Sequence, residues 1–216
     1  MQTAAAPSRK PRPQAAPDGA QAPQPKSQVW RETDHIIVTS SVTWAGYMAM
    51  RALCDSPGIR MAYDQGVLEI MSPSYEHENA KTLIGRLIEA YAVERDIELI
   101  GCGSTTLRKE IKERGLEPDE CYNVGHPFEQ APDFAIEVVI TGGGIDKLPI
   151  YASIGVQEVW FWCEGKFDLF TLVGDSYEAT TATKFLPELD LDFVAELVRT
   201  GDQHKSVRAL LARLRG

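Results

Sequence analysis

Apolar residues recur at helical spacing in the longest patterned segment of the chain. Between Ala80 and Tyr91 they lie three or four positions apart, which places them on one face of a helix predicted over residues 75–95. Ser74 can cap this helix, and Thr43 can cap a shorter one. The other predicted helices span residues 44–53, 146–154, 191–198 and 205–214.

Alternating and uninterrupted apolar runs predict the strands. Met61 and Tyr63 alternate with smaller or polar residues before a turn at residues 64–66, which indicates a hairpin over residues 60–71. The clearest strand, residues 133–140, is a nearly continuous apolar run, as in a strand buried on both faces. Further strands are expected over residues 101–107, 119–124, 156–163 and 167–173.

The order of these elements predicts the fold class and the domain organisation. Strands and helices are mixed without strict alternation, which indicates an α/β or α+β fold with a mixed sheet. Residues 1–28 hold six of the 13 prolines, and Met1 is their only large apolar residue. Because such a segment cannot bury enough area to offset its ordering entropy, we expect a disordered tail. A single domain is then expected over residues 29–216, beginning near Val29.

Composition narrows the class of protein. Hydrophobic residues make up 44% of the chain and charged residues 25%, as in soluble globular proteins. No apolar run reaches the roughly 18–20 residues of a transmembrane helix, and no apolar segment at the N-terminus indicates a secretory signal. The four cysteines form no CxxC pair, which disfavours a disulfide scaffold or a zinc site. We therefore expect a reduced, cytoplasmic protein without a membrane partner.

The charge of the chain is unevenly distributed. The net charge is −9, but residues 1–28 carry four basic side chains and one acidic one, so residues 29–216 carry −12. An acidic domain is poor evidence for broad nucleic-acid binding, because phosphates are bound by lysine and arginine. It is compatible with a metal site built from carboxylates.

A carboxylate, Glu137, interrupts the apolar run of residues 133–140. A carboxylate buried in a sheet is costly unless it is paired with a cation, hydrogen-bonded or bound to a metal. Glu137 is therefore interpreted either as one partner of a structural ion pair or as a catalytic acid or metal ligand.

Two more carboxylates precede Glu137. Asp119 opens the strand over residues 119–124, and carboxylates on adjacent strands lie about 5 Å apart and can share one divalent cation. Asp133 is four residues before Glu137 on the same strand, so about 13 Å of extended chain separates them. Asp119 and Glu137 form the better chelating pair. Asp133 joins them only if the strand is bulged, and otherwise serves as a turn residue after Pro132.

Polar residues at two helix starts are further candidates. Lys147 falls in the first turn of the helix over residues 146–154, where its charge opposes the helix dipole, so it is better explained if it faces an anion. A solvated surface lysine is the alternative. Glu76 and His77 lie in the first turn of the long helix, near its apolar stripe, and can lean toward the sheet. For His77 a purely structural role is the alternative.

The motifs, taken in order, resemble one protein family. They are Leu68-Glu69-Ile70-Met71-Ser72-Pro73, His77, Glu117-Pro118-Asp119, Pro132-Asp133-Phe134-Ala135-Ile136-Glu137-Val138, Lys147-x-x-x-Tyr151 and Gly155-Val156-Gln157-Glu158-Val159-Trp160. Over about residues 40–175 this set resembles the Uma-two family, bacterial proteins described as putative restriction endonucleases of the PD-(D/E)XK nuclease superfamily. The resemblance implies a restriction-endonuclease-like fold, in which helices flank a core of four strands in a mixed sheet, and Mg²⁺-dependent phosphodiester hydrolysis.

One position departs from the superfamily pattern. The usual third motif places a lysine two residues after the acid, on the same strand, whereas this chain has Val139 there. The resemblance implies that Lys147 reaches back from the following helix to replace that lysine.

These expectations combine into one hypothesis, a metal-dependent endonuclease that acts on DNA rather than RNA. Asp119 and Glu137, together with Asp133, would hold Mg²⁺ or Mn²⁺. Lys147 would orient the attacking water or stabilise charge in the transition state, and Glu76 or His77 would tune the site. A second copy of the chain is a further candidate partner.

Two other interpretations stay open. A catalytically degenerate module that keeps the nuclease fold and binds a partner is favoured by the acidic domain and by the displaced lysine. A metal-dependent hydrolase of a small phosphoester is the third possibility. Cleavage of plasmid DNA separates the first two, and a screen of nucleotide substrates separates the third.

Overall fold

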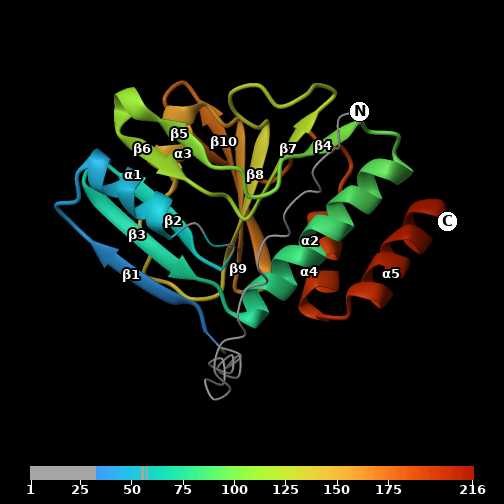
Figure 1. The fold of residues 1–216 in the computed structure, drawn as a ribbon. Coiled ribbons are helices and arrows are strands. Elements are labelled where there is room, and N and C mark those ends of the chain that lie inside the picture. The colour runs from blue at the N-terminus through green and yellow to red at the C-terminus, as the bar shows by residue number, and fades with distance from the viewer. Residues whose placement is uncertain (1–32, 55, 57) are drawn as a thin grey trace, which may run out of the picture.

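Two β-sheets pack against each other in the structure, a computed structural model that describes residues 33–54, 56 and 58–216 (Figure 1). Side chains from strands of both sheets share one buried apolar cluster, which includes Leu116 from one sheet and Ala135 from the other. The predicted tail, residues 1–28, and the predicted start of the fold near Val29 lie outside the described residues.

The first sheet has five strands in the order β1-β3-β2-β6-β5, all antiparallel. They are β1 (His35–Thr39), β2 (Arg60–Asp64), β3 (Val67–Ser72), β5 (Leu107–Lys109) and β6 (Arg114–Leu116). The short helix η1 (Glu110–Lys112) connects the last two strands. Helix α1 (Trp44–Leu53) lies against this sheet, where Tyr47 stacks on Tyr63 with ring centroids 4.9 Å apart.

The second sheet is mixed and has six strands in the order β11-β10-β9-β8-β7-β4. Only β8 and β9 are parallel among its pairs. The strands are β4 (Leu99–Gly101), β7 (Glu120–Val124), β8 (Phe134–Val139), β9 (Glu158–Cys163), β10 (Lys166–Val173) and β11 (Ser176–Thr180). Together with the helices they confirm the predicted mixed class, an α+β fold.

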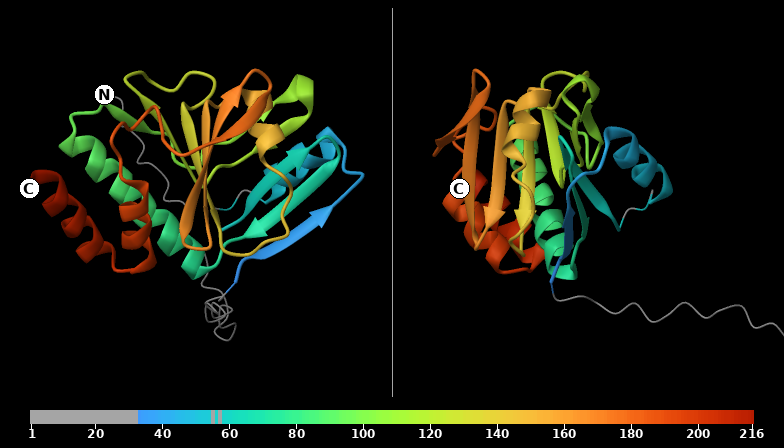
Figure 2. Two further views of the ribbon diagram at one scale, coloured as in Figure 1. Left: turned by 180° about the vertical axis from the view of Figure 1, so that it is seen from behind. Right: turned by 90° about the vertical axis from the view of Figure 1, so that its left-hand side faces the viewer.

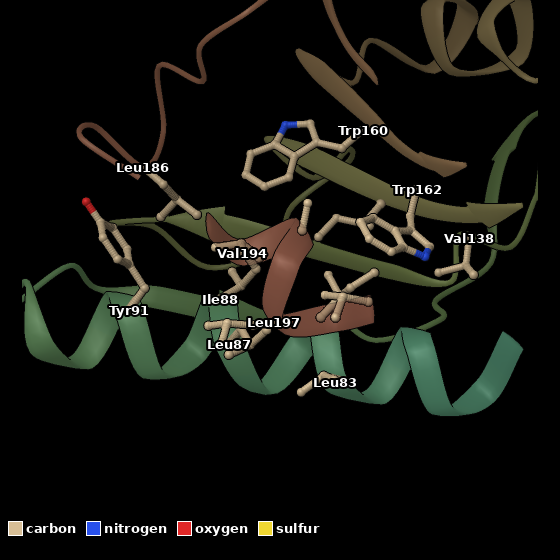
Figure 3. Packing of buried hydrophobic residues seen from close by; sticks show 14 of the residues in the cluster. Leu83, Leu87, Ile88, Tyr91, Val138, Trp160, Trp162, Leu186, Val194 and Leu197 are labelled. Atoms are coloured by element: carbon tan, nitrogen blue, oxygen red, sulfur yellow. The ribbon is translucent and has the colours of Figure 1, made fainter. Parts of the chain in front are cut away.

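Three helices pack on one side of the six-stranded sheet, where two of them contact its strands and the third packs against those two, as Figure 2 shows from behind. They are α2 (Tyr75–Glu94), α4 (Leu191–Arg199) and α5 (Gln203–Arg215). The apolar stripe predicted for the long helix forms this core: Leu83, Leu87 and Ile88 pack with Val194 and Trp160 (Figure 3). No helix in the described part of the chain is long and apolar enough to cross a membrane.

The opposite face of the six-stranded sheet carries the polar side chain of Glu137. Along β8, Phe134, Ile136 and Val138 belong to the helix-covered core, so the residues between them point the other way. Ala135 packs there against Tyr151 of helix α3 (Leu148–Ile154). This alternation directs the next residue on that face, Glu137, toward α3 and the five-stranded sheet.

The predicted elements differ from the structure most clearly between residues 101 and 107. The strand expected there is wrong: β4 ends at Gly101 in one sheet, and β5 begins at Leu107 in the other. The chain changes sheets within this segment, so its extended residues cannot continue a single ladder. The helix expected over residues 146–154 begins later, at Leu148, with Lys147 as its N-cap residue.

Candidate active site

The polar groups gather around two connecting segments. Residues 117–119 carry the backbone from β6 of one sheet to β7 of the other, and residues 140–147 connect β8 to α3. This second connection is called the glycine loop here because it contains Gly142, Gly143 and Gly144. Each passage places side chains at the contact between the sheets.

Asp119 and Glu137 lie side by side, as their sequence pattern predicts. The antiparallel register pairs Glu120 with Ile136, so the next residues are Glu137 in β8 and Asp119, which immediately precedes β7. Asp119 Oδ2 accepts a hydrogen bond from the backbone N–H of Val138 at 2.8 Å. Both carboxylates are 1% exposed, so each depends on partners supplied by the protein.

Glu137 receives one donor on each carboxylate oxygen. Lys147 Nζ lies 2.7 Å from Glu137 Oε2, and the Tyr151 hydroxyl donates a short hydrogen bond to Oε1. Burial raises the pKa of Glu137 above its usual value, and the Lys147 charge offsets only part of this. Burial and the nearby Glu137 charge raise the pKa of Tyr151 well above its usual value, so its phenol keeps the proton that it donates.

Lys147 stays charged although it is largely buried. Its side chain is 16% exposed, and its ammonium lies between Glu137 and the more distant Glu69 Oε1, at 3.9 Å. Burial would lower the pKa of Lys147, but the charges of Glu137, Asp119 and Glu69 outweigh burial and raise that pKa. The predicted contact between Lys147 and the Glu137 carboxylate is therefore present, and it is made from the N-cap position.

His77 connects Asp119 to a second aspartate. Its Nε2 lies 3.0 Å from Asp119 Oδ1, and its Nδ1 lies 3.3 Å from Asp34 Oδ2. Burial would lower the pKa of His77, but the hydrogen bonds to Asp119 and Asp34 raise it to about 9. For both aspartates burial acts to raise the carboxyl pKa, and the interactions with His77 outweigh it, so both pKa values are lowered. The imidazolium therefore balances two buried carboxylates.

The other two predicted site residues lie elsewhere. Asp133 Oδ2 accepts a hydrogen bond from the Val124 backbone at 2.8 Å and lies 3.1 Å from His126 Nε2, at the start of β8. Glu76 is exposed on the first turn of α2 and lines a separate cavity of about 490 Å³. The structure thus brings together Asp119, Glu137, Lys147 and His77, without Asp133 or Glu76.

Three residues of this constellation were not predicted as site residues. Tyr151 has a signal in the sequence, because a residue four positions after Lys147 lies near the same face of a helix. Glu69 interrupts the apolar run of residues 67–71, as Glu137 does in its own strand, and it belongs to the first of the family motifs. Asp34 has no comparable signal. Glu69 reaches the site from β3 and Asp34 from the segment just before β1, and the packing of the two sheets brings both there.

A cavity of about 220 Å³ opens beside the constellation and is lined by Asp34, Glu69, Thr141, Lys147 and Phe161, among others. No group of three or more His, Cys, Asp or Glu residues in the described part of the chain could by itself hold a metal ion. Two carboxylates nevertheless suit Mg²⁺, which is commonly held by one or two carboxylates together with water and substrate phosphates. Each carboxylate oxygen also keeps a second lone pair beside its present donor.

The arrangement defines a class of fold. A mixed sheet with helices on one face, and an acidic pair at two adjacent strands beside a lysine ammonium, is consistent with a restriction-endonuclease-like fold. The chain belongs to the Uma2 family, described as "Putative restriction endonuclease", whose sequence model matches residues 44–205. This confirms the predicted family. No curated protein matches the chain.

Proposed function

We propose that this chain is a metal-dependent endonuclease that hydrolyses phosphodiester bonds in DNA. The observation that supports this most is the ion pair of 2.7 Å between Lys147 Nζ and Glu137 Oε2, beside the Asp119 carboxylate. Nuclease chemistry of this kind needs acidic ligands and a fixed positive charge within reach of one phosphate. All three side chains belong to the segment that matches the endonuclease family.

Asp119 and Glu137 would hold the divalent cation, Mg²⁺ or Mn²⁺. Their oxygens are the hard ligands that these ions prefer. When bound, such a cation polarises a phosphoryl oxygen and lowers the pKa of an attacking water. Asp133 is bonded to the Val124 backbone and is therefore not part of this proposed ligand set.

The chain's own residues supply the remaining functions. Hydrolysis forms a bond between a water oxygen and phosphorus and breaks the bond to the leaving oxygen, while negative charge grows on the phosphoryl oxygens. The attacking water releases a proton to solvent, and the leaving oxygen takes one up from solvent. The Lys147 ammonium orients the water or stabilises that charge. Tyr151 and His77 hold the carboxylates of Glu137 and Asp119 in fixed orientations through their hydrogen bonds.

Plasmid nicking in Mg²⁺ or Mn²⁺ tests the proposal. Glu137→Gln and Lys147→Ala should each reduce cleavage by about 100-fold or more, and Lys147→Arg should also be poor because a planar guanidinium does not replace a compact ammonium. The exposed residue Lys166 provides the matched control, Lys166→Ala. Since Lys147 neutralises a buried carboxylate, each assay is run below the melting temperature of its variant.

The outcomes separate the candidate functions. Cleavage by Lys147→Ala at the wild-type rate would contradict the mechanism. An intact wild-type fold that cleaves neither DNA nor RNA of the same sequence, with either metal, would instead support the second candidate, a non-catalytic interaction module. The charge of −12 on residues 29–216 favours that candidate, because it repels a polyanion. Turnover of nucleotide phosphoesters alone would indicate a small-molecule hydrolase.

A further inference from the structure

Glu69 belongs to the five-stranded sheet, but its carboxylate contacts the glycine loop of the other sheet. It lies in β3, and its side chain is buried, at 3% exposure. Glu69 Oε2 accepts a hydrogen bond from the backbone N–H of Ile145 at 2.8 Å. Ile145 is two residues before Lys147, so this bond fixes the backbone from which the lysine side chain extends.

Gly144 makes room for this carboxylate. A Cβ atom at residue 144 would lie 2.3 Å from Glu69 Oε2, which is far closer than two such atoms can approach. The backbone at Gly144 does not have a positive φ, whereas its neighbour Gly143 has φ 103°. Glycine is thus needed at 143 for the turn and at 144 for the close approach of Glu69.

We propose that Glu69 is a positioning residue, which holds the glycine loop so that the Lys147 ammonium reaches Glu137. This inference rests on the proposed function, in which Lys147 acts on the phosphate. Glu69 acts on the lysine mainly through the loop, because its own carboxylate oxygen is 3.9 Å from Nζ, compared with 2.7 Å for Glu137. The five-stranded sheet thereby takes part in forming the site.

Three substitutions separate the hydrogen bond from the charge. Glu69→Gln removes the charge but keeps an oxygen that accepts from the Ile145 N–H. Glu69→Ala removes both. Gly144→Ala keeps the charge and displaces the carboxylate. The matched control is Gly142→Ala, because a Cβ there meets no atom within 4 Å and φ is not positive.

Hydrogen exchange at the Ile145 amide reports on the loop without any need for activity. In metal-free buffer, Glu69→Ala and Gly144→Ala should accelerate this exchange about tenfold, the expected loss of one charge-assisted hydrogen bond. Glu69→Gln and Gly142→Ala should keep nearly wild-type protection. Thermal melts of each variant identify global unfolding, and Gly144→Ala provides the answer if Glu69→Ala fails to fold.

Plasmid cleavage then links the loop to the chemistry. Glu69→Ala and Gly144→Ala should lower kcat about 100-fold with little change in KM, since a displacement of about 1 Å at a catalytic group has this effect. Glu69→Gln should keep most of the wild-type kcat, because it keeps the acceptor oxygen. Normal protection at Ile145 in both disruptive variants, or lost protection with a normal kcat, would overturn the inference. A wild-type protein that cleaves no substrate would overturn the proposed function, and the exchange data would still report the loop contact.

Discussion

Each oxygen of the two central carboxylates has a hydrogen-bond donor from the protein. Asp119 is bound by His77 and by a backbone N–H, and Glu137 by Lys147 and Tyr151. Burial of an ionised carboxylate without such donors would cost several kcal/mol. The donors therefore maintain two adjacent acids in a buried position.

The environment of His77 predicts a pH dependence of stability. Its pKa is raised to about 9, compared with about 6.5 in an unfolded chain. The charged imidazolium thus stabilises the fold fully below pH 6.5, and this contribution is lost as the pH rises through about 9. At about 1.4 kcal/mol per pKa unit, the free energy of unfolding should fall by about 3 kcal/mol over this range.

Urea unfolding in EDTA between pH 6.5 and 9.5 measures this decrease. His77→Gln cannot take up the proton, so its unfolding free energy should lack that slope, although it should be lower than that of the wild type at pH 6.5. Equal slopes in the two proteins would show that His77 is neutral in the folded state.

At the level of single residues, the sequence predicted those site residues whose signals are local. Glu137 was recognisable because it interrupts an apolar strand, and Asp119 because it opens the neighbouring one. Asp133 was proposed with them from the same strand, but the register places it at the far end, beside His126. Glu69 was not assigned a role, because its partner Ile145 lies 76 residues away in the glycine loop.

Capping side chains begin four of the described helices, and one of these side chains, that of Ser74, belongs to the site. Ser74 accepts a hydrogen bond from the His77 N–H at 3.1 Å, and its own N–H donates to Asp34 at 2.8 Å. Thr43 caps α1 in the same way through the Gly46 N–H. The two caps thus have the same function in their helices, but only Ser74 contacts the residues that hold His77.

Paired alanine substitutions distinguish these roles. Ser74→Ala and Thr43→Ala should each lower the free energy of unfolding by about 1 kcal/mol, the usual effect of a lost N-cap. Only Ser74→Ala should also shift the His77 imidazole resonances in NMR spectra, since only that cap lies on the His77 backbone. Unchanged His77 resonances in Ser74→Ala would contradict a link between the cap and the site.

Elements with strong local patterns were predicted, and elements defined by their partners were not. The capped helices, the hairpin around residues 64–66 and the strands expected over residues 156–163 and 167–173 correspond to the structure. Strand β1 was not predicted, because most of its side chains are exposed on both faces and show no alternation. Strands β4, β5 and β6 have three residues each, too few to carry a period. The division into two sheets was therefore not visible in the sequence.

The proposed metal site predicts an effect on the whole molecule. A cation that binds only the folded state stabilises it by about 2.7 kcal/mol at one hundred times its Kd. For a domain of this size that corresponds to a rise in Tm of about 5–10 °C. Millimolar Mn²⁺ should therefore raise the Tm of the wild type, and Glu137→Gln should abolish the shift.

The exposed helix residue Glu196 provides the matched control, because Glu196→Gln changes the same charge at a distance from the site. This variant should keep the full Mn²⁺ shift. A wild type whose melting curve does not respond to millimolar Mn²⁺ would count against Asp119 and Glu137 as metal ligands.

The contact between the two sheets also has a consequence for the order of folding. The hydrogen bonds of Glu69 with Ile145 and of Asp34 with Thr141 join residues 76 and 107 positions apart. Contacts of such long range require the closure of large loops and form late, after the local hairpins and helices. Their φ-values should be near zero, so that variants at Glu69 accelerate unfolding and leave the refolding rate unchanged. The site is then among the last parts of the molecule to form, and a nascent chain acquires the geometry of this site only after both sheets are complete.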